Sequence, residues 1–439
     1  MNAMTQRLTQ LAEQVSAMPV RTRLGRLTGI AGPTLRAGLS GVRISDICHI
    51  DRPGMPPLIA EVAGIVGPEV ILTPYSATTG LQVGAIVRPS KTPLSVAVTD
   101  GMLGRVVDAF GEPIDGLGPL RGSTELRTIK ANAPSAMERP LIEDILSTGL
   151  RVIDGSLTLG RGQRMAIFGA PGTGKSRLLA EIARHTEADI VIIGLVGERG
   201  REVREFIERD LTEEVCRNVV IVAATSDRAP VERAICAQTA TSVAEYFRDQ
   251  GKSVLLMIDS LTRTARALRE IGLSAGEAPT RRGYPASVYP ALPAIIERSG
   301  RAEKGDITAI YTVLTESDGQ GDPIAEEVRS LTDGHIVLSQ KLAEAGHFPA
   351  IDVLESLSRI MSTVVSTNHQ RDAHKMRQHL SKYAEVELLL QIGEYKTGGD
   401  PEADAAIAAM PNIRKFLQQE FGIGMLFKMM RAQMQEALK

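Results

Sequence analysis

The first twenty residues carry apolar side chains at the spacing of an amphipathic helix. Within 1–20 they recur every three or four positions with polar residues between them, at Leu8, Leu11, Val15 and Met18. This periodicity predicts a short helix with one apolar stripe. The stripe has two possible roles, packing against the helix's own domain or docking a regulatory partner.

The pattern changes to short apolar runs between residues 21 and 92. The runs alternate with glycine and proline turns and occupy 42–47, 58–62, 70–72 and 85–87. Runs of strand length bounded by turn residues are typical of antiparallel β-structure. We therefore predict a small all-β domain that closes into a barrel.

Strand and helix patterns alternate over residues 93–345. A region rich in glycine and proline comes first, and a long helical pattern at 230–250 follows the third strand candidate. Because crossover helices cover the faces of a sheet, this alternation predicts a parallel sheet with helices on both sides. The strand candidates are 164–168, 190–196, 219–224, 254–258 and 307–314.

Helical patterns dominate the last part of the chain, residues 346–439. We expect no strand after about Phe348. The methionines of the tail are interpreted as core packing, because methionine fills irregular gaps. The sequence thus predicts a C-terminal α-helical domain, with helical spacing at 360–380, 382–392 and 425–438.

Composition excludes several classes of function. The chain has 439 residues, of which 23% are charged and 43% hydrophobic, as expected for a protein of two or three domains. A net charge of −2, 3% aromatic residues and no tryptophan argue against a nucleic-acid partner. The three cysteines form no C-x-x-C pair, and neither a signal-peptide pattern nor a long apolar stretch is present. We therefore expect a cytoplasmic protein in a reducing compartment.

The segment Gly169-Ala-Pro-Gly-Thr-Gly-Lys-Ser176 matches G-x-x-x-x-G-K-[ST], the phosphate-binding loop, between a strand candidate and helical spacing at 177–184. Small residues let backbone N–H groups surround a phosphate, and the helix start adds its dipole. Lys175 is expected to bridge the β- and γ-phosphates of a nucleoside triphosphate, and the Ser176 hydroxyl to ligate Mg²⁺. The predicted nucleotide-binding residues are Gly169, Pro171, Gly172, Thr173, Gly174, Lys175, Ser176 and Arg177.

Two carboxylates follow other strand candidates. Asp259 comes directly after 254–258, and Glu198 follows 190–196. Since the carboxyl ends of parallel strands meet at one edge of a sheet, both should lie beside the P-loop. Asp259 is expected to hold Mg²⁺ through its water shell. Glu198 either orients the water that attacks the γ-phosphate or forms a surface ion pair with neighbouring arginines.

Several longer motifs extend this picture. They are Gly197-Glu-Arg-Gly-Arg-Glu-Val-Arg-Glu-Phe206, Asp259-Ser-Leu-Thr-Arg263, Arg269-Glu-Ile-Gly-Leu273, Pro279-Thr-Arg-Arg-Gly-Tyr-Pro285 and Asp333-Gly-His-Ile-Val-Leu338. Together these motifs resemble the ATPases of type III protein secretion, which are similar to the catalytic subunits of rotary ATP synthases. The likeness extends from about residue 20 to the C-terminus.

The resemblance implies a RecA-like P-loop core between the barrel and the helical domain, in a homohexamer with ATP sites between neighbouring subunits. In this pattern Glu198 is the water-activating carboxylate, and Arg199 and Arg263 support it and the phosphates. Phe348 is expected to lie against the adenine ring. Arg359 matches the arginine finger that reaches into the adjacent subunit's site.

The family also implies a function, the hydrolysis of Mg-ATP to energise type III secretion, with release of effectors from chaperones and their unfolding. Expected partners are stalk and stator or regulatory proteins, effector–chaperone complexes and the export gate at the inner membrane, where the protein attaches peripherally. The loop 281–285 faces the central channel in related hexamers. Residues 326–330 and 391–395 favour the virulence or symbiosis injectisome branch over the flagellar branch.

Three alternatives remain at this point. A catalytic subunit of a rotary F/V-type ATPase would have nearly the same active-site residues. A hexameric RNA translocase would need aromatic side chains on the barrel, where Tyr75 stands without phenylalanine or tryptophan. A non-hydrolytic scaffold subunit would lack the carboxylate of Glu198.

Overall fold

Six strands close into a barrel in the N-terminal part of the chain. They pair antiparallel in the order β1-β2-β5-β4-β3-β6. Leu35, Leu58 and Leu72 on three of these strands are fully buried in the barrel core. The predicted barrel is therefore confirmed. The strands are β1 (Gly25–Ala31), β2 (Thr34–Gly38), β3 (Ile47–Arg52), β4 (Met55–Val66), β5 (Glu69–Pro74) and β6 (Ile86–Pro89).

One run that was expected to be a strand is a turn. Residues 42–46 precede β3, and within them Ser45 has a φ of 71°. The side chain of Asp46 accepts a hydrogen bond from the backbone N–H of Arg43 at 2.7 Å. A left-handed residue beside an aspartate-closed turn interrupts extended backbone, although the residue pattern alternates as in a strand. The prediction of a strand at 42–47 was wrong.

The computed structural model describes residues 24–31, 34–90, 92–211, 216–315 and 321–439. The chain divides into two units between Leu94 and Ser95. The amphipathic helix predicted at 1–20 lies outside the described residues. None of the helices in the described ranges combines the length and the hydropathy needed to cross a bilayer.

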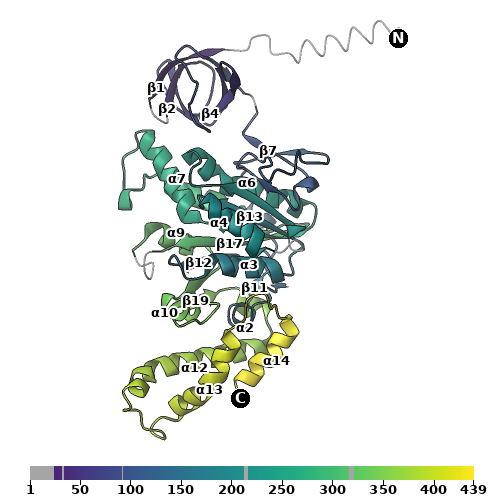
Figure 1. The fold of residues 1–439 in the computed structure, drawn as a ribbon, viewed down its shortest axis with the longest axis vertical. Coiled ribbons are helices and arrows are strands. Elements are labelled where there is room, and N and C mark those ends of the chain that lie inside the picture. The colour runs from purple at the N-terminus through teal and green to yellow at the C-terminus, as the bar shows by residue number, and fades with distance from the viewer. Residues whose placement is uncertain (1–23, 32–33, 91, 212–215, 316–320) are drawn as a thin grey trace, which may run out of the picture. The chain divides into compact units, whose positions relative to one another are not determined.

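A nine-stranded sheet forms the centre of the second unit (Figure 1). Its order is β19-β18-β12-β17-β15-β13-β14-β8, with β16 pairing β17 outside this path. Every residue of β13, β14 and β15 is buried, because helices cover both faces of these parallel strands. The strands are β8 (Val106–Val107), β12 (Arg164–Gly169), β13 (Ile190–Val196), β14 (Val219–Ala224), β15 (Ser253–Asp259), β16 (Gly300–Arg301), β17 (Asp306–Leu314), β18 (Gly334–Leu338) and β19 (Ile351–Ser358).

The five strands predicted for this sheet are all present, and so are the helices predicted beside them. Short ladders, β7 with β9 and β10 with β11, accompany the main sheet. Their bounds are β7 (Ser95–Val98), β9 (Glu125–Thr128), β10 (Ile145–Leu146) and β11 (Leu159–Gly160). The helices are α2 (Arg151–Ser156), α3 (Lys175–His185), α4 (Gly200–Glu205), α6 (Pro230–Asp249), α7 (Leu261–Ser274), α8 (Val288–Ile296), α9 (Pro323–Leu331) and α10 (Gln340–Glu344), with a π-helix at Phe206–Asp210 after α4.

The edge strand β19 corrects the expectation that no strand follows Phe348. It pairs antiparallel with β18, from Leu338 opposite Ile351 to Gly334 opposite Ser358. An antiparallel edge strand on a mainly parallel sheet is common in large mixed sheets. The sequence did not predict it, because its apolar residues do not alternate strictly and both Leu354 and Leu357 are exposed.

Helices form the end of the chain, as predicted. One helix, α12, replaces the two helical segments expected between 360 and 392, and it lies antiparallel to α13 (Figure 1). Met430 and Met434 of the tail are fully buried in the same core as the sheet, which confirms the packing role of these two side chains, whereas the prediction was wrong for Met429, which is 56% exposed. The helices are α11 (Met361–Val364), α12 (Thr367–Gln391), α13 (Pro401–Leu417) and α14 (Phe427–Ala437).

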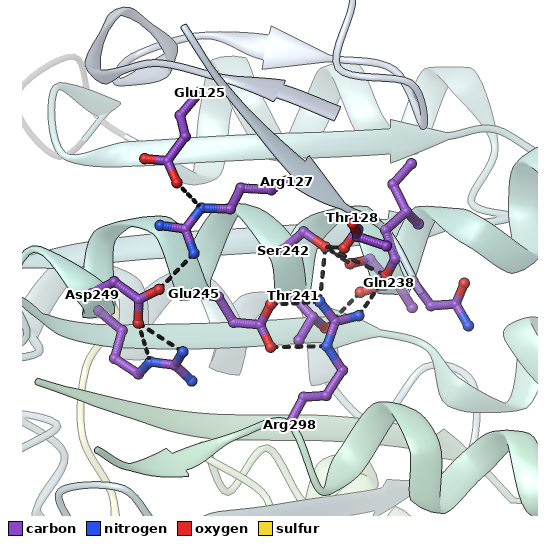
Figure 2. Close-up of polar contacts among 12 residues, drawn as sticks. Glu125, Arg127, Thr128, Gln238, Thr241, Ser242, Glu245, Asp249 and Arg298 are labelled. Atoms are coloured by element: carbon purple, nitrogen blue, oxygen red, sulfur yellow. Dashed lines mark hydrogen bonds and ion pairs between the residues drawn. The ribbon is translucent and has the colours of Figure 1, made fainter. Parts of the chain in front are cut away.

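A buried arginine connects three segments of the second unit (Figure 2). The guanidinium of Arg298, which is 1% exposed, binds both carboxylate oxygens of Glu245 on α6 at 2.9 and 2.6 Å. It also donates to Ser242 on α6 at 2.8 Å and to the carbonyl oxygen of Ile129, after β9, at 2.6 Å. Because every partner oxygen is inside the protein, the cation stays buried without loss of hydrogen bonds.

We expect Glu245→Ala to destabilise the protein by about 3–5 kcal/mol, because the substitution leaves the Arg298 guanidinium buried without its counter-charge. Chemical denaturation monitored by circular dichroism measures the change. The control is Glu385→Ala, which removes one of the two partners of Lys382, beside Asp400, at an exposed site and should cost less than about 1 kcal/mol. Equal effects of the two substitutions would contradict a structural role for the buried pair.

Candidate active site

The P-loop joins the end of β12 to the start of α3. Gly172 and Gly174 both have a φ of 86°, in the left-handed region that glycine adopts without strain. Thr173 closes the loop by donating its hydroxyl to the carbonyl oxygen of Ala170 at 2.8 Å. Because α3 begins at Lys175, its free N–H groups and its positive dipole end face this loop. The geometry suits a phosphate group.

An ion pair connects the P-loop, which follows β12, to β15, the strand on the other side of β17 in the sheet. Nζ of Lys175 lies 2.6 Å from Oδ1 of Asp259, the last residue of β15. Thr312, on the intervening strand β17, donates its hydroxyl to the same oxygen at 2.7 Å. The Asp259 side chain is only 3% exposed, and a carboxylate removed from water needs such partners. The pair fixes both side chains at the carboxyl edge of the sheet.

The turn after β13 carries Glu198 to the same edge. Oε2 of Glu198 lies 2.9 Å from Nη1 of Arg263 in the first turn of α7, and Arg263 also donates to the carbonyl oxygen of Gly197. On the other side, Gly197 N donates to Ala224 O at 2.6 Å and Ser226 N donates to Glu198 O at 3.0 Å. The turn is therefore held both by α7 and by the chain that follows β14.

Burial raises the pKa of Glu198 to about 7, and the negative charge of Asp259 and a hydrogen bond with Glu202 contribute to the rise. The positive charges of Arg263 and Lys175 act in the opposite direction. A carboxyl group with a pKa near neutrality is a suitable general base, because it is ionised in part and still binds a proton well. The environment of Glu198 therefore fits proton abstraction from water.

Oxygen donors of the chain meet beside the P-loop. Ser176, Glu198 and Asp259 line one cavity of about 180 Å³. In the described part of the chain, no group of three or more His, Cys, Asp or Glu side chains is arranged to hold a metal by itself. One carboxylate and one hydroxyl, completed by phosphate oxygens and water, are the usual protein share of a Mg²⁺ site. The remaining polar lining is Glu202, Glu205 and Asp210.

Arg199 lies apart from these residues. Its side chain is 81% exposed, and its Nε lies 3.9 Å from Oε1 of Glu202. Glu198 thus pairs with Arg263, which is distant in sequence, rather than with the adjacent arginine. Within one chain Arg263 is the arginine that contacts the predicted catalytic carboxylate, whereas the role assigned to Arg199 stays a prediction.

Arg359 lies at the opposite edge of the sheet from the P-loop of its own chain. β18 runs parallel to β12, so its end at Leu338 is on the P-loop side and its start at Gly334 is on the other. β19 runs back from Ile351 to Ser358, and Arg359 follows directly. The two ends of β18, Gly334 and Leu338, are four residues apart, which is roughly 13 Å at the usual rise of a strand. The exposed side chain of Arg359 is thus directed to a different surface from that of Lys175.

Phe348 lies against the P-loop, together with an aromatic ring that the sequence did not single out. A Cβ at Gly174 would lie 3.3 Å from Cε1 of Phe348, so the loop and the ring touch. Phe421 lines the same cavity of about 50 Å³ as Phe348 and Gly174. The guanidinium carbons of Arg177 and Arg184 lie 5.0 and 4.8 Å from the centre of the Phe421 ring. In the sequence, the only sign of a role for Phe421 was that it is an isolated aromatic residue in a chain with few of them.

The segment between α13 and α14 forms a wall of this region. Gly422 N donates to the Glu181 carboxylate on α3 at 2.8 Å, and Met425 N donates to Gly149 O at 3.0 Å. The side chain of Gln419 also donates to Gly149 O, at 2.9 Å. A cavity of about 630 Å³ extends from Phe348 along the segment. Phe348 lines both this cavity and the smaller one that reaches Thr173 and Gly174 of the P-loop, so the larger space lies on the far side of a ring that touches the loop, a position that fits a nucleoside.

Comparison with known proteins identifies the family. The nucleotide-binding domain of the ATP synthase alpha/beta family matches residues 149–358, and the C-terminal domain of the EscN ATPase of type III secretion matches 365–436. A type 3 secretion system ATPase of Sinorhizobium fredii is 49% identical over 94% of this chain and 91% of its own length. The chain belongs to the type 3 secretion system ATPases. A flagellum-specific ATP synthase of Bacillus subtilis is 45% identical over 90% and 91% of the two chains.

Solved structures of this ATPase family agree with the fold. The assembled ATPase EscN of the enteropathogenic E. coli type III secretion system has a TM-score of 0.90 at 43% identity, covering 94% of this chain and 100% of that one. EscN in complex with its central stalk EscO has a TM-score of 0.88 at 42% identity with the same coverage. The RecA-like core of this ATPase, its barrel and its C-terminal helices are thus those of the family.

We expect Phe348→Ala to weaken ATP binding about tenfold, because the adenine base loses the aromatic ring it would stack on while the phosphate contacts remain. Titration with a fluorescent ATP analogue measures the dissociation constant. Phe348→Tyr is the control and should bind nearly as tightly, since it keeps the ring. An unchanged affinity for Phe348→Ala would remove the ring from the base site.

Proposed function

We propose that this ATPase hydrolyses Mg-ATP to energise type III protein secretion. The observation that carries the proposal is the group formed by Lys175, Asp259, Glu198 and Arg263 at one sheet edge, in a chain similar to secretion ATPases along nearly its full length. Phosphoryl transfer to water needs positioning and neutralisation of charge more than covalent help, and these residues supply both.

Each residue of the group has a distinct part in the reaction. Glu198 accepts a proton from the water that attacks the γ-phosphate, and its pKa of about 7 supports this role. Arg263 orients the Glu198 carboxylate. The Lys175 ammonium neutralises the β- and γ-phosphates, and the backbone N–H groups of the P-loop bind the phosphate oxygens. Arg199 supports the phosphates from the rim of the site.

Ser176 and Asp259 would hold Mg²⁺. When bound there, the cation would neutralise negative charge on the phosphate oxygens. Asp259 would then interact with two cations, Mg²⁺ and the Lys175 ammonium, which contacts the same carboxylate.

The functional form is a homohexameric ring in which Arg359 acts on the nucleotide of an adjacent subunit. The position of Arg359, at the edge opposite its own P-loop, supports action in trans. A permanently charged guanidinium fits the spread charge of the transferring phosphoryl group. Hydrolysis would then depend on assembly, and the similar ATPase EscN has been solved in an assembled form.

The partners follow from the relatives. EscN binds a central stalk, and we propose an equivalent stalk protein here, with stator or regulatory proteins, effector–chaperone complexes and an export gate. Such a complex would be cytoplasmic and attached peripherally to the inner membrane. The secretion-type C-terminal domain favours this function over that of a rotary ATP synthase subunit. An export ATPase of the flagellar branch is the second candidate, because a flagellar relative is nearly as similar.

Two substitutions separate binding from chemistry. Lys175→Ala should lose tight ATP binding, because the phosphates lose their main cation, whereas Glu198→Gln should bind ATP and hydrolyse it at least ~10²-fold more slowly. Phosphate release and nucleotide titration, measured on the same preparations, give the two quantities. Turnover of Glu198→Gln at the parent rate would assign the catalytic role to another residue.

Mixed rings test the action of Arg359 in trans. Arg359→Ala should bind nucleotide normally and lose on the order of 10³-fold in kcat. Mixing it with Glu198→Gln subunits should restore part of the activity, because some interfaces then combine an intact Glu198 with an intact Arg359. Mixed assemblies, verified by native mass spectrometry, that stay inactive would exclude the arrangement in trans.

A further inference from the structure

Both supports of the Glu198 turn lead to one ion pair, between Arg233 on α6 and Glu270 on α7. Nη2 of Arg233 lies 2.7 Å from Oε2 of Glu270. The Arg233 side chain is 15% exposed and that of Glu270 is 49% exposed. Neither residue belongs to the P-loop or to any residue set given a chemical role above. Their position between the two supports connects the pair to the catalytic turn.

The first support is the chain between β14 and α6. Ser226 N holds the carbonyl oxygen of Glu198 at 3.0 Å, and the turn closes where Arg228 N donates to Thr225 O at 3.0 Å. Nε of Arg233 then donates to the carbonyl oxygen of Arg228 at 3.1 Å. Because Arg233 is in the first turn of α6, it fixes this loop to a rigid helix.

The second support is α7. Arg263 in its first turn holds the Glu198 carboxylate, and Glu270 is seven residues further along. Seven residues are close to two helical turns, so the two side chains lie on the same face of α7. The ion pair of Glu270 with Arg233 therefore restrains the same face of α7 that carries Arg263.

The two arginines also pack on the turn itself. Gly197 has a φ of 65°, and a Cβ at this position would lie 3.2 Å from Cδ of Arg263 and 3.8 Å from Cδ of Arg233. The aliphatic stems of both side chains thus flank the glycine that precedes Glu198. If either stem moves, the packing around Gly197 changes, and the backbone of this turn can shift with it.

We propose that Arg233 and Glu270 are positioning residues for hydrolysis, whose ion pair holds the loop after β14 and α7 in the register that aims Glu198. The proposal rests on the proposed role of Glu198 as the water-activating carboxylate. A closed path results in which contacts join Glu198 to Ser226, Arg228 to Arg233, Arg233 to Glu270 and Arg263 to Glu198, while the chain itself joins Ser226 to Arg228 and α7 joins Glu270 to Arg263.

The effect of the pair is expected in catalysis more than in stability. A partly exposed ion pair contributes little to the free energy of unfolding. A small displacement of a catalytic group, in contrast, lowers turnover strongly, because the attack on phosphorus needs an aligned water. Contacts with the nucleotide come from the P-loop and the aromatic rings, so affinity for ATP should not change.

The test measures kcat and nucleotide affinity of the full-length ATPase with Arg233→Ala, Glu270→Ala and the milder Glu270→Gln. We expect each alanine variant to lose about tenfold in kcat, while the dissociation constant of a fluorescent, non-hydrolysable ATP analogue stays within about twofold. The charge-swapped double variant Arg233→Glu/Glu270→Arg restores the ion pair but not the hydrogen bond to Arg228, so it should turn over faster than either alanine variant without reaching the parent rate. Unchanged kcat in all three single variants, or a parallel loss of affinity, would overturn the proposal.

Asp372→Ala is the matched control. Asp372 on α12 pairs with Arg431 on α14 at 2.7 Å, with side chains 24% and 17% exposed, and should leave kcat unchanged. A similar loss of kcat in this control would reduce the effect at Glu270 to general destabilisation and would contradict the proposal.

A double-mutant cycle separates this inference from the proposed function. If Glu270 acts through Glu198, then Glu270→Ala should cost nothing further in a Glu198→Gln background. An additional loss there would contradict the positioning role. Full activity of Glu198→Gln alone would contradict the proposed role of Glu198, whereas an inactive Glu198→Gln beside a fully active Glu270→Ala would contradict only the positioning role.

Discussion

The ion pair between Lys175 and Asp259 is the constraint on which the candidate active site depends. Both charges lie where water has little access, so each requires the other and Thr312 adds a hydrogen bond. This requirement holds the start of α3 to the end of β15 across the intervening strand. The P-loop and the Asp259 carboxylate therefore keep a fixed separation in the protein without its substrate, which reduces the reorganisation needed when a triphosphate binds.

The direction of the strands decides which side chains can cooperate within one chain. Lys175, Glu198 and Asp259 all follow the carboxyl ends of parallel strands, and they meet although up to 84 residues separate them. β19 runs the other way, so the residue after it is delivered to the opposite edge. The same sheet thus builds a nearly complete site on one side and offers an arginine on the other.

Much of the fold followed from periodicity and spacing. Five strands of the sheet were predictable because buried parallel strands are continuous apolar runs, and the P-loop was predictable because its glycines have a required geometry. β19 was missed because an edge strand with exposed leucines has no distinct period. The turn at Ser45 was missed because a single left-handed residue overrides an alternating pattern.

Contacts between distant side chains were beyond the sequence. The pairing of Glu198 with Arg263 instead of Arg199 depends on how α7 packs beside the turn after β13, which no local pattern records. Phe421 could be recognised as a neighbour of Phe348 and the P-loop only after the segment between α13 and α14 was placed against α3. The family resemblance identified Phe348 and Arg359 as candidates, but their surroundings came from the packing.

The segment between α13 and α14 also limits how far the C-terminal helices can be exchanged between related proteins. Gly422 binds Glu181 on the P-loop helix α3, and Gln419 and Met425 bind Gly149 before α2, so the helical end of the chain is not an independent part of the molecule. Grafting it onto another nucleotide-binding core would also exchange one wall of the cavity beside Phe348. The core and the C-terminal helices of such a chimera would have to match at these contacts, or the hybrid would keep its fold and lose the shape of this cavity.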